Sequence, residues 1–275
     1  MTLDPKNHLM PHPIYQLKDI EKLNFTHRKP ADFTDRLALT TVKNFRRLFD
    51  LLTGYNQDRY SGRLWLNRVI FLETIAGVPG MCGGMTIHLK SLRTLKPDRG
   101  FIHYLLEEAE NERTHLFLFM NYKNPSYLFR AMIAMGQGVF WNFYFLWYLI
   151  SPRFCHRFVG YLEEEAVHTY SIFLKQMDAG YLPEFNVQAS KMARDYYQLS
   201  DDATFRDMVL SIRADESVHR EFNHYFSDLK PDEEIENLQV YVTEENDEQV
   251  QNIKLDEEIS KNKEVEFKQE TEKPF

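Results

Sequence analysis

Cysteine, glycine and proline are all scarce in this chain of 275 residues. The two cysteines, Cys82 and Cys155, lie far apart and no Cys-x-x-Cys occurs, which argues against a disulfide scaffold or a zinc ribbon. Eleven glycines and eleven prolines are too few for a fibrous or low-complexity chain. At this length we expect one domain with a sizeable core, or two small ones.

A concentrated basic region is also missing. The net charge of −8 divides into −10 for residues 231–275 and +2 for residues 1–230. A nearly neutral body argues against nucleic-acid binding, which needs a basic face. The acidic segment has few large apolar residues and no helical period, so residues 229–275 are predicted to form a disordered tail. A docking segment for a basic partner is the alternative.

The start of the chain shows neither a secretory signal nor an Arg-rich transit peptide. This observation fits three alternatives: a presequence that has been removed, a protein that never had one, and an internal targeting signal. Residues 1–28 are predicted to form an extended arm, and residues 29–228 a single helical domain.

Apolar periodicity predicts an all-α fold with six main helices. They cover residues 34–53, 60–94, 98–121, 126–149, a segment opened by Ser151-Pro152, and 203–225, with a further short helix near 187–198. Pro79 and Gly83-Gly84 predict a kink in the second helix. The first helix is amphipathic, with a basic face that contains Lys43, Arg46 and Arg47.

Three Glu-x-x-His pairs lie in these helices: Glu112/His115, Glu165/His168 and Glu216/His219. A di-iron four-helix bundle takes one Glu from each of two helices and a Glu-x-x-His from each of the other two. Residues i and i+3 share a helix face, so both side chains of a pair can reach one metal. Two single glutamates precede two of the pairs, and together they predict two iron ions held by Glu73, Glu112, His115, Glu163, Glu216 and His219.

A single Glu-x-x-His is common in helical chains and usually marks a solvated face. Glu73, however, lies within Val-Ile-Phe-Leu-Glu-Thr-Ile-Ala, where a buried carboxylate needs a metal or a cation. A buried ion pair with Arg68 or a histidine is the alternative. The pair Glu165/His168 is not expected to bind metal, because Glu165 lies about 200° around the helix from Glu163.

The residues around these positions resemble the signature boxes of the alternative oxidases, the cyanide-insensitive ubiquinol:oxygen oxidoreductases of mitochondria. The resemblance covers about residues 12 to 228, and the four boxes occur in the family's order. They are Leu72-Glu73-Thr74, Asn111-Glu112-Arg113-Thr114-His115, Leu162-Glu163-Glu164-Glu165-Ala166 and Arg213-Ala214-Asp215-Glu216-x-x-His219. The resemblance implies a ferritin-like di-iron bundle that reduces O2 to water with ubiquinol, pumps no protons, and lies on the matrix face of the inner mitochondrial membrane or of a related organelle's membrane.

The resemblance also implies roles for individual residues. It places a quinol pocket at Arg68, Leu72, Ala76, Leu162, Glu165, Ala166 and Thr169, of which Glu165 and Thr169 would take part in catalysis. Simple helix packing is the alternative for the apolar members. Tyr170, two turns after Glu163, would donate an electron and a proton during O–O cleavage. Asn111 and Asp215 are candidates for orienting the histidines.

Residues 131–150 contain no charged side chain and are long enough to span a bilayer. A span would draw Glu112 and Glu163 toward opposite sides of the membrane, and the iron site could not assemble. We therefore expect this segment and residues 34–53 to lie in one leaflet as two membrane-facing helices. The resemblance implies the same monotopic arrangement.

A homodimer is implied by the resemblance as well, with its contacts at His88, Leu92, Arg93, Leu106 and Gln137. The sequence departs from the family's pattern at Tyr197, where Trp is usual, and at His168, where an aliphatic residue is usual. A di-iron quinone hydroxylase and a ferritin-like iron-storage protein are the alternatives. The apolar segment 131–150 speaks against storage, and the boxes around Asn111 and residues 163–165 fit the oxidases more fully than the hydroxylases.

Overall fold

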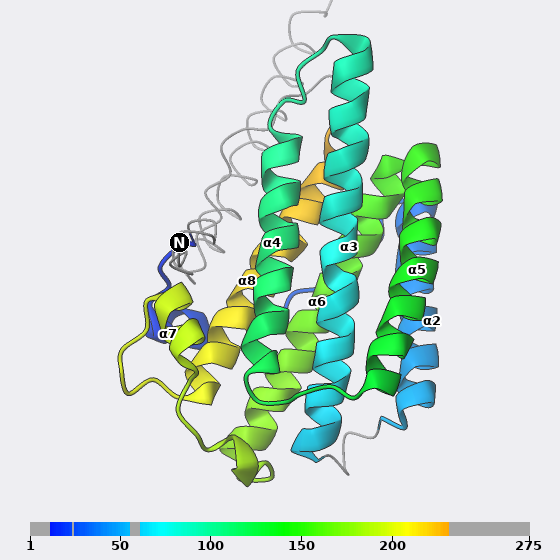
Figure 1. Ribbon diagram of the computed structural model, residues 1–275. Helices are drawn as coiled ribbons and strands as arrows, with labels where there is room; N and C mark the ends of the chain where they lie inside the picture. The colour runs from blue at the N-terminus through cyan, green and yellow to red at the C-terminus, as the bar shows by residue number, and fades with distance from the viewer. Residues whose placement is uncertain (1–11, 24, 56–60, 231–275) are drawn as a thin grey trace, which may run out of the picture.

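The computed structural model describes residues 12–23, 25–55 and 61–230. Helices and no β-strand occur within these ranges, which confirms the all-α prediction. Four long helices form a bundle (Figure 1), and they are α3 (Gly62–Thr94), α4 (Phe101–Met120), α6 (Pro152–Asp178) and α8 (Phe205–Asp228). Helix α3 packs along α4, and α6 packs along α8. The two pairs face each other across the centre of the bundle.

Polar caps explain where three of the four bundle helices begin. The side chain of Ser61 accepts from the backbone at the start of α3, and Ser151 does the same for α6, whose first turn contains Pro152. Thr204 and Asp207 form a reciprocal capping box at the start of α8. The observed helix ends lie within one turn of the predicted ones. Helix α3 continues unbroken through Pro79.

Two glycines allow the paired helices to approach closely. A Cβ atom at Gly80 of α3 would overlap the carbonyl oxygen of Leu105 on α4. A Cβ atom at Gly160 of α6 would overlap the imidazole of His224 on α8. Because both contacts leave no room for a side chain, each helix pair is held at a short separation, and the residues on the inner faces are brought toward one another.

Helices α2 (Phe33–Thr53) and α5 (Tyr127–Ile150) lie together on one side of the bundle (Figure 1). The ring of Phe45 on α2 lies 6.5 Å from that of Phe140 and 6.1 Å from that of Phe143 on α5. Both helices expose large apolar side chains: Phe33, Leu48, Leu51 and Leu52 on α2, and Met135, Val139, Leu146, Leu149 and Ile150 on α5. The two additional helices and their apolar surface are therefore present as predicted.

Helix α3 is the one helix of the described ranges that is long and apolar enough to cross a membrane, with a mean hydropathy of 1.4 over its most apolar window. Helix α5, where the sequence raised the possibility of a span, does not meet this criterion. Because α3 is also a bundle helix with much of its surface covered by α4, its length and hydropathy are weak evidence for a span.

The arm predicted as extended contains a short helix, α1 (Leu17–Glu21). Ile20 is buried in the core of the bundle, and the guanidinium of Arg213 on α8 donates to the carbonyl oxygens of Ile20 and Glu21 at 2.7 and 3.1 Å. One isolated turn would not be stable in water. The packing of α1 against α8 supplies the missing stability. The sequence of the arm does not indicate this packing.

The connection between α6 and α8 contains a 3₁₀ turn, η2 (Pro183–Phe185), and the helix α7 (Lys191–Tyr197). Helix α7 confirms the short helix expected near residues 187–198. The predicted tail, apart from its first two residues, and the first eleven residues of the arm lie outside the described residues.

Candidate metal centre

The bundle brings all six predicted metal ligands together. Helix α3 contributes Glu73 and α6 contributes Glu163, while α4 and α8 each contribute one Glu-x-x-His. Their ligand atoms form two groups, each within 4.8 Å: Glu73, Glu112, His115 and Glu216 in one, and Glu112, Glu163, Glu216 and His219 in the other. All six side chains are buried. Glu112 and Glu216 belong to both groups, so their carboxylates lie where two neighbouring ions would share them.

Several polar atoms of this cluster lack a satisfactory hydrogen bond. Nδ1 of His115 lies 3.3 Å from Oε1 of Glu216, and Nδ1 of His219 lies 2.8 Å from Oε1 of Glu112. Five buried atoms nevertheless have no partner of acceptable geometry among the described residues: Glu73 Oε2, both carboxylate oxygens of Glu112, His115 Nδ1 and His219 Nδ1. Unsatisfied buried polar atoms are costly. Carboxylates and imidazoles that all face one space fit two iron ions.

The cluster concentrates negative charge away from water. Burial raises the pKa of Glu73 to about 8. Burial, followed by the carboxylates of Glu216 and Glu112, raises the pKa of Glu163 well above its usual range. Burial alone would lower the pKa of His219, but Glu112 and Glu216 more than offset it and raise that pKa. The groups therefore hold protons in the absence of a stronger cation, and metal binding would release them.

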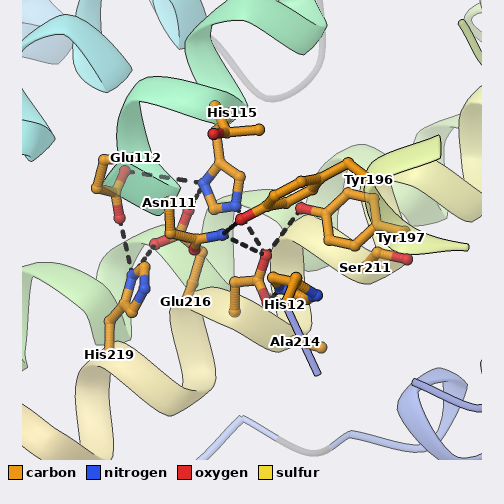
Figure 2. Close-up of polar contacts among 12 residues, drawn as sticks. His12, Asn111, Glu112, His115, Tyr196, Tyr197, Ser211, Ala214, Glu216 and His219 are labelled. Carbon is orange, nitrogen blue, oxygen red and sulfur yellow. Dashed lines mark hydrogen bonds and ion pairs between the residues drawn. The ribbon is translucent and has the colours of Figure 1, made fainter. Parts of the chain in front are cut away.

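Asp215 on α8 orients the imidazole of His115. Its Oδ2 accepts hydrogen bonds from Nε2 of His115 at 2.9 Å, the hydroxyl of Tyr197 at 2.8 Å and Nδ2 of Asn111 at 3.2 Å. Figure 2 shows His115 between Glu112 on one side and the two tyrosines Tyr196 and Tyr197 on the other. With Nε2 bonded to Asp215, Nδ1 is the ring nitrogen that faces the carboxylates, where it could bind a metal ion. The contacts expected of Asn111 and Asp215 are thus present.

Tyr170 on α6 contacts the cluster directly. Its hydroxyl donates a hydrogen bond to Oε1 of Glu73, and its ring stacks on Phe119 at 6.2 Å. Burial raises the pKa of this phenol well above its usual range, so the hydroxyl keeps its proton at neutral pH. A protonated phenol therefore lies in contact with a candidate ligand.

The residues predicted for a quinol pocket lie on α3 and α6. Arg68 and Thr169 are buried, while Glu165 and the apolar members Leu72, Ala76, Leu162 and Ala166 are partly exposed. Side chains of α2 link the two charged residues of this set, Arg68 and Glu165, through ion pairs. Arg68 donates to Oδ1 of Asp50 at 2.5 Å, Nε of Arg46 lies 3.6 Å from Oδ2 of the same carboxylate, and Arg46 also pairs with Glu165.

Sequence reasoning missed the roles of Arg46 and Asp50. The basic face of residues 34–53 was a partial signal, but the sequence did not show which helix that face meets. It also missed Glu108, which is buried one turn before Glu112 and accepts a hydrogen bond from Nδ2 of Asn223 at 2.8 Å. Burial raises the pKa of Glu108 to about 7.

The third Glu-x-x-His pair lies on another face of α6. Neither Glu165 nor His168 belongs to the two ligand groups found among the described residues. Glu165 pairs with Arg46, and the ring of His168 lies 5.3 Å from that of Phe25. Among the expected dimer contacts, Gln137 is used within the chain, where it donates to the carbonyl oxygen of Thr74 at 2.6 Å.

Comparison with known proteins places the chain in a family. The family model for alternative oxidase matches residues 15–228. "Alternative oxidase, mitochondrial" of Yarrowia lipolytica is 47% identical over 229 residues, which cover 79% of this chain and 65% of that protein. The protein of the same name from Wickerhamomyces anomalus is 47% identical over 239 residues, covering 81% and 70%. The chain thus spans about two thirds of the length of these curated relatives. With its matched residues including every candidate ligand, the chain belongs to the alternative oxidase family.

Proposed function

We propose that this chain is a non-haem di-iron ubiquinol oxidase. The observation that carries the proposal is the pair of ligand groups that share Glu112 and Glu216. We infer that the two iron ions are held by Glu73, Glu112, His115, Glu163, Glu216 and His219. In the overall reaction, two ubiquinol molecules give four electrons and four protons to one O2, forming two quinones and two waters. No proton is pumped.

The iron ions would supply oxygen binding and reversible electron transfer. The residues of the chain do the rest. Asp215 keeps the Nε2 proton on His115, and the apolar surroundings exclude bulk water. Tyr170 holds a phenolic hydrogen beside Glu73 that can be transferred as a proton and an electron. Its contact with Glu73 supports this role.

We infer that the quinol head group binds between α2, α3 and α6. Glu165 is the proposed proton acceptor for a quinol hydroxyl, with Arg46 fixing its carboxylate and Thr169 one turn away on the same helix face. Arg68 would bond a quinol oxygen from the opposite wall. The apolar members Leu72, Ala76, Leu162 and Ala166 would contact the ring and the first isoprenoid units.

The apolar surface of α2 and α5 supports attachment to one leaflet of a membrane. Since relatives are named mitochondrial, we propose the inner mitochondrial membrane, matrix face, or its counterpart in a related organelle. The protein should be released by detergent but not by about 1 M salt, because burial of apolar side chains is insensitive to charge screening. Protease sites added at both ends should be cut from the same side of sealed vesicles, and cutting from opposite sides would contradict the topology.

A homodimer through α3 and α4 completes the proposal. The exposed Leu92, His88 and Arg93 on α3 support it, together with the partly exposed Leu106 on α4. Light scattering in mild detergent, corrected for bound detergent, should give twice the chain mass. A monomer at working concentrations would count against this assembly.

The function is tested by iron content together with product analysis. We expect two irons per chain, consumption of one O2 per two ubiquinols, and a quinone product of unchanged skeleton. Replacing Glu163 or Glu216 with Ala should abolish both iron binding and turnover. A product with an added oxygen atom would instead favour the di-iron quinone hydroxylase, and a multi-subunit shell that accumulates many irons would favour the storage protein.

A further inference from the structure

His12 reaches Asp215 from a distant part of the chain. Its Nε2 lies 2.8 Å from Oδ1 of Asp215, 203 residues away in sequence. Only 6% of the His12 side chain and 2% of the Asp215 side chain are exposed. Asp215 in turn accepts from Nε2 of His115, a candidate metal ligand, at 2.9 Å. Only the side chain of Asp215 therefore separates His12 of the arm from His115 of the candidate metal site.

The partners of His12 fix the position of its ring. Its Nδ1 lies 2.6 Å from the carbonyl oxygen of Pro13, and its Nε2 faces the carboxylate of Asp215. A carboxylate accepts hydrogen bonds. Nε2 of His12 therefore donates to Oδ1 of Asp215.

Aromatic side chains hold the His12 ring in place. Its ring centroid lies 5.2 Å from that of Tyr15, 4.7 Å from that of Tyr196 and 4.9 Å from that of Tyr197. The hydroxyl of Tyr15 also donates to Oδ1 of Asp215, at 2.7 Å. Oδ1 of this carboxylate is thus bonded by the arm, and Oδ2 is bonded by groups of the helical domain, including His115. Fixing one oxygen fixes the direction of the other.

We propose that His12 is a positioning residue of the metal centre, which acts through Asp215 to hold the His115 ring with Nδ1 turned toward the carboxylates. The proposal rests on the proposed di-iron function. The hydrogen bonds from His12 and Tyr15 fix Oδ1 of Asp215, so that Oδ2 stays directed at Nε2 of His115. The arm then helps to determine the geometry of the metal site.

The test compares full-length variants at position 12. His12→Phe keeps a ring among the tyrosines but loses both ring nitrogens, and His12→Ala removes the ring altogether. His12→Gln keeps one hydrogen-bond donor without the ring. Each purified, iron-loaded protein is exposed to a ferrous chelator, and the rate of iron loss is followed spectroscopically. His103→Phe, which replaces an exposed histidine paired with Glu107 at 3.6 Å, is the matched control.

We expect iron loss about tenfold faster in His12→Phe and His12→Ala than in the wild type, an intermediate rate in His12→Gln, and the wild-type rate in His103→Phe. Wild-type rates in both His12→Phe and His12→Ala would overturn the proposal. The wild-type rate in His12→Phe together with fast loss in His12→Ala would also overturn it, because the packing of the ring would then matter rather than its bond to Asp215. A wild-type chain that binds no iron would instead refute the proposed function itself.

Discussion

The hydroxyl of Tyr197 donates a hydrogen bond to Oδ2 of Asp215 at 2.8 Å, the same oxygen that accepts the Nε2 hydrogen of His115 at 2.9 Å. The family resemblance leads us to expect an indole at this position. A phenol and an indole can both donate one hydrogen bond from an aromatic ring. The departure therefore keeps a donor beside Asp215.

This contact predicts the behaviour of two substitutions. Tyr197→Phe removes the donor and should lower iron retention against a chelator by about tenfold, because Asp215 is then less firmly held. Tyr197→Trp should stay close to the wild type, since the indole N–H can replace the hydroxyl. Iron per chain after a fixed time in chelator measures both effects. Equal retention in the Phe and wild-type proteins would show that the hydroxyl has no such role.

Substitutions of His168 on α6 and His219 on α8 should differ sharply in their effects on iron binding and turnover. His168→Ile, which introduces an aliphatic side chain, should keep iron and most activity, because His168 lies outside both ligand groups. His219→Ala removes a candidate ligand and should lose most turnover and part of the iron. Steady-state oxygen uptake and metal analysis check both variants. The reverse ranking would mean that the wrong face of α6 had been assigned to the metal.

The grouping of the six candidate ligands could be predicted from sequence because it depends on local geometry. The spacing in Glu112/His115 and Glu216/His219 fixes a shared helix face, and the apolar run around Glu73 indicates burial. The pairing of Arg46 with Glu165 could not be predicted in this way, because it depends on how α2 is rotated against α6. A helix's own sequence shows which face is apolar but not which neighbour that face meets.

The contacts of the arm were hidden for the same reason. His12 meets Asp215 across 203 residues, and nothing near either position signals the other. The short helix α1 likewise depends on Arg213 of α8 for its terminal hydrogen bonds. The sequence indicates where an arm precedes the bundle, but the docking of that arm is a property of the assembled fold.

The buried His156 predicts a pH dependence of stability. Its Nε2 lies 3.0 Å from the hydroxyl of Tyr148 and its Nδ1 3.2 Å from Oδ1 of Asn223, and burial lowers its pKa to about 4. The unfolded chain binds a proton here below about pH 6.5, whereas the folded chain does so only below about pH 4. Stability is therefore lost as the pH falls from about 6.5 toward 4, by up to about 1.4 kcal/mol per pH unit from this group.

The variant His156→Gln isolates this contribution, because its amide is neutral throughout and can bond both neighbours. Between about pH 6.5 and about pH 5, the wild type should lose roughly 2 kcal/mol more unfolding free energy than the variant. Urea titrations at both pH values supply the numbers. Parallel losses in the two proteins would contradict a buried neutral histidine.

Deletion of residues 231–275 should leave iron content and turnover unchanged. This segment carries a charge of −10 and few large apolar side chains, so it lacks the means to pack on the bundle. Metal analysis and oxygen uptake of the truncated chain provide the check, and its solubility or partner binding could still change. Loss of iron on truncation would show that the segment belongs to the fold.

Oxygen uptake with a soluble ubiquinol analogue, in membranes that contain this chain, tests the central claim most directly. Cyanide is added to block haem-copper oxidases, and membranes with Glu163→Ala serve as the matched control. The proposed centre uses carboxylate and imidazole ligands without haem or copper, so uptake should continue in cyanide with the wild type and cease with the variant. Wild-type uptake that cyanide abolishes, or equal uptake with Glu163→Ala, would contradict the di-iron ubiquinol oxidase.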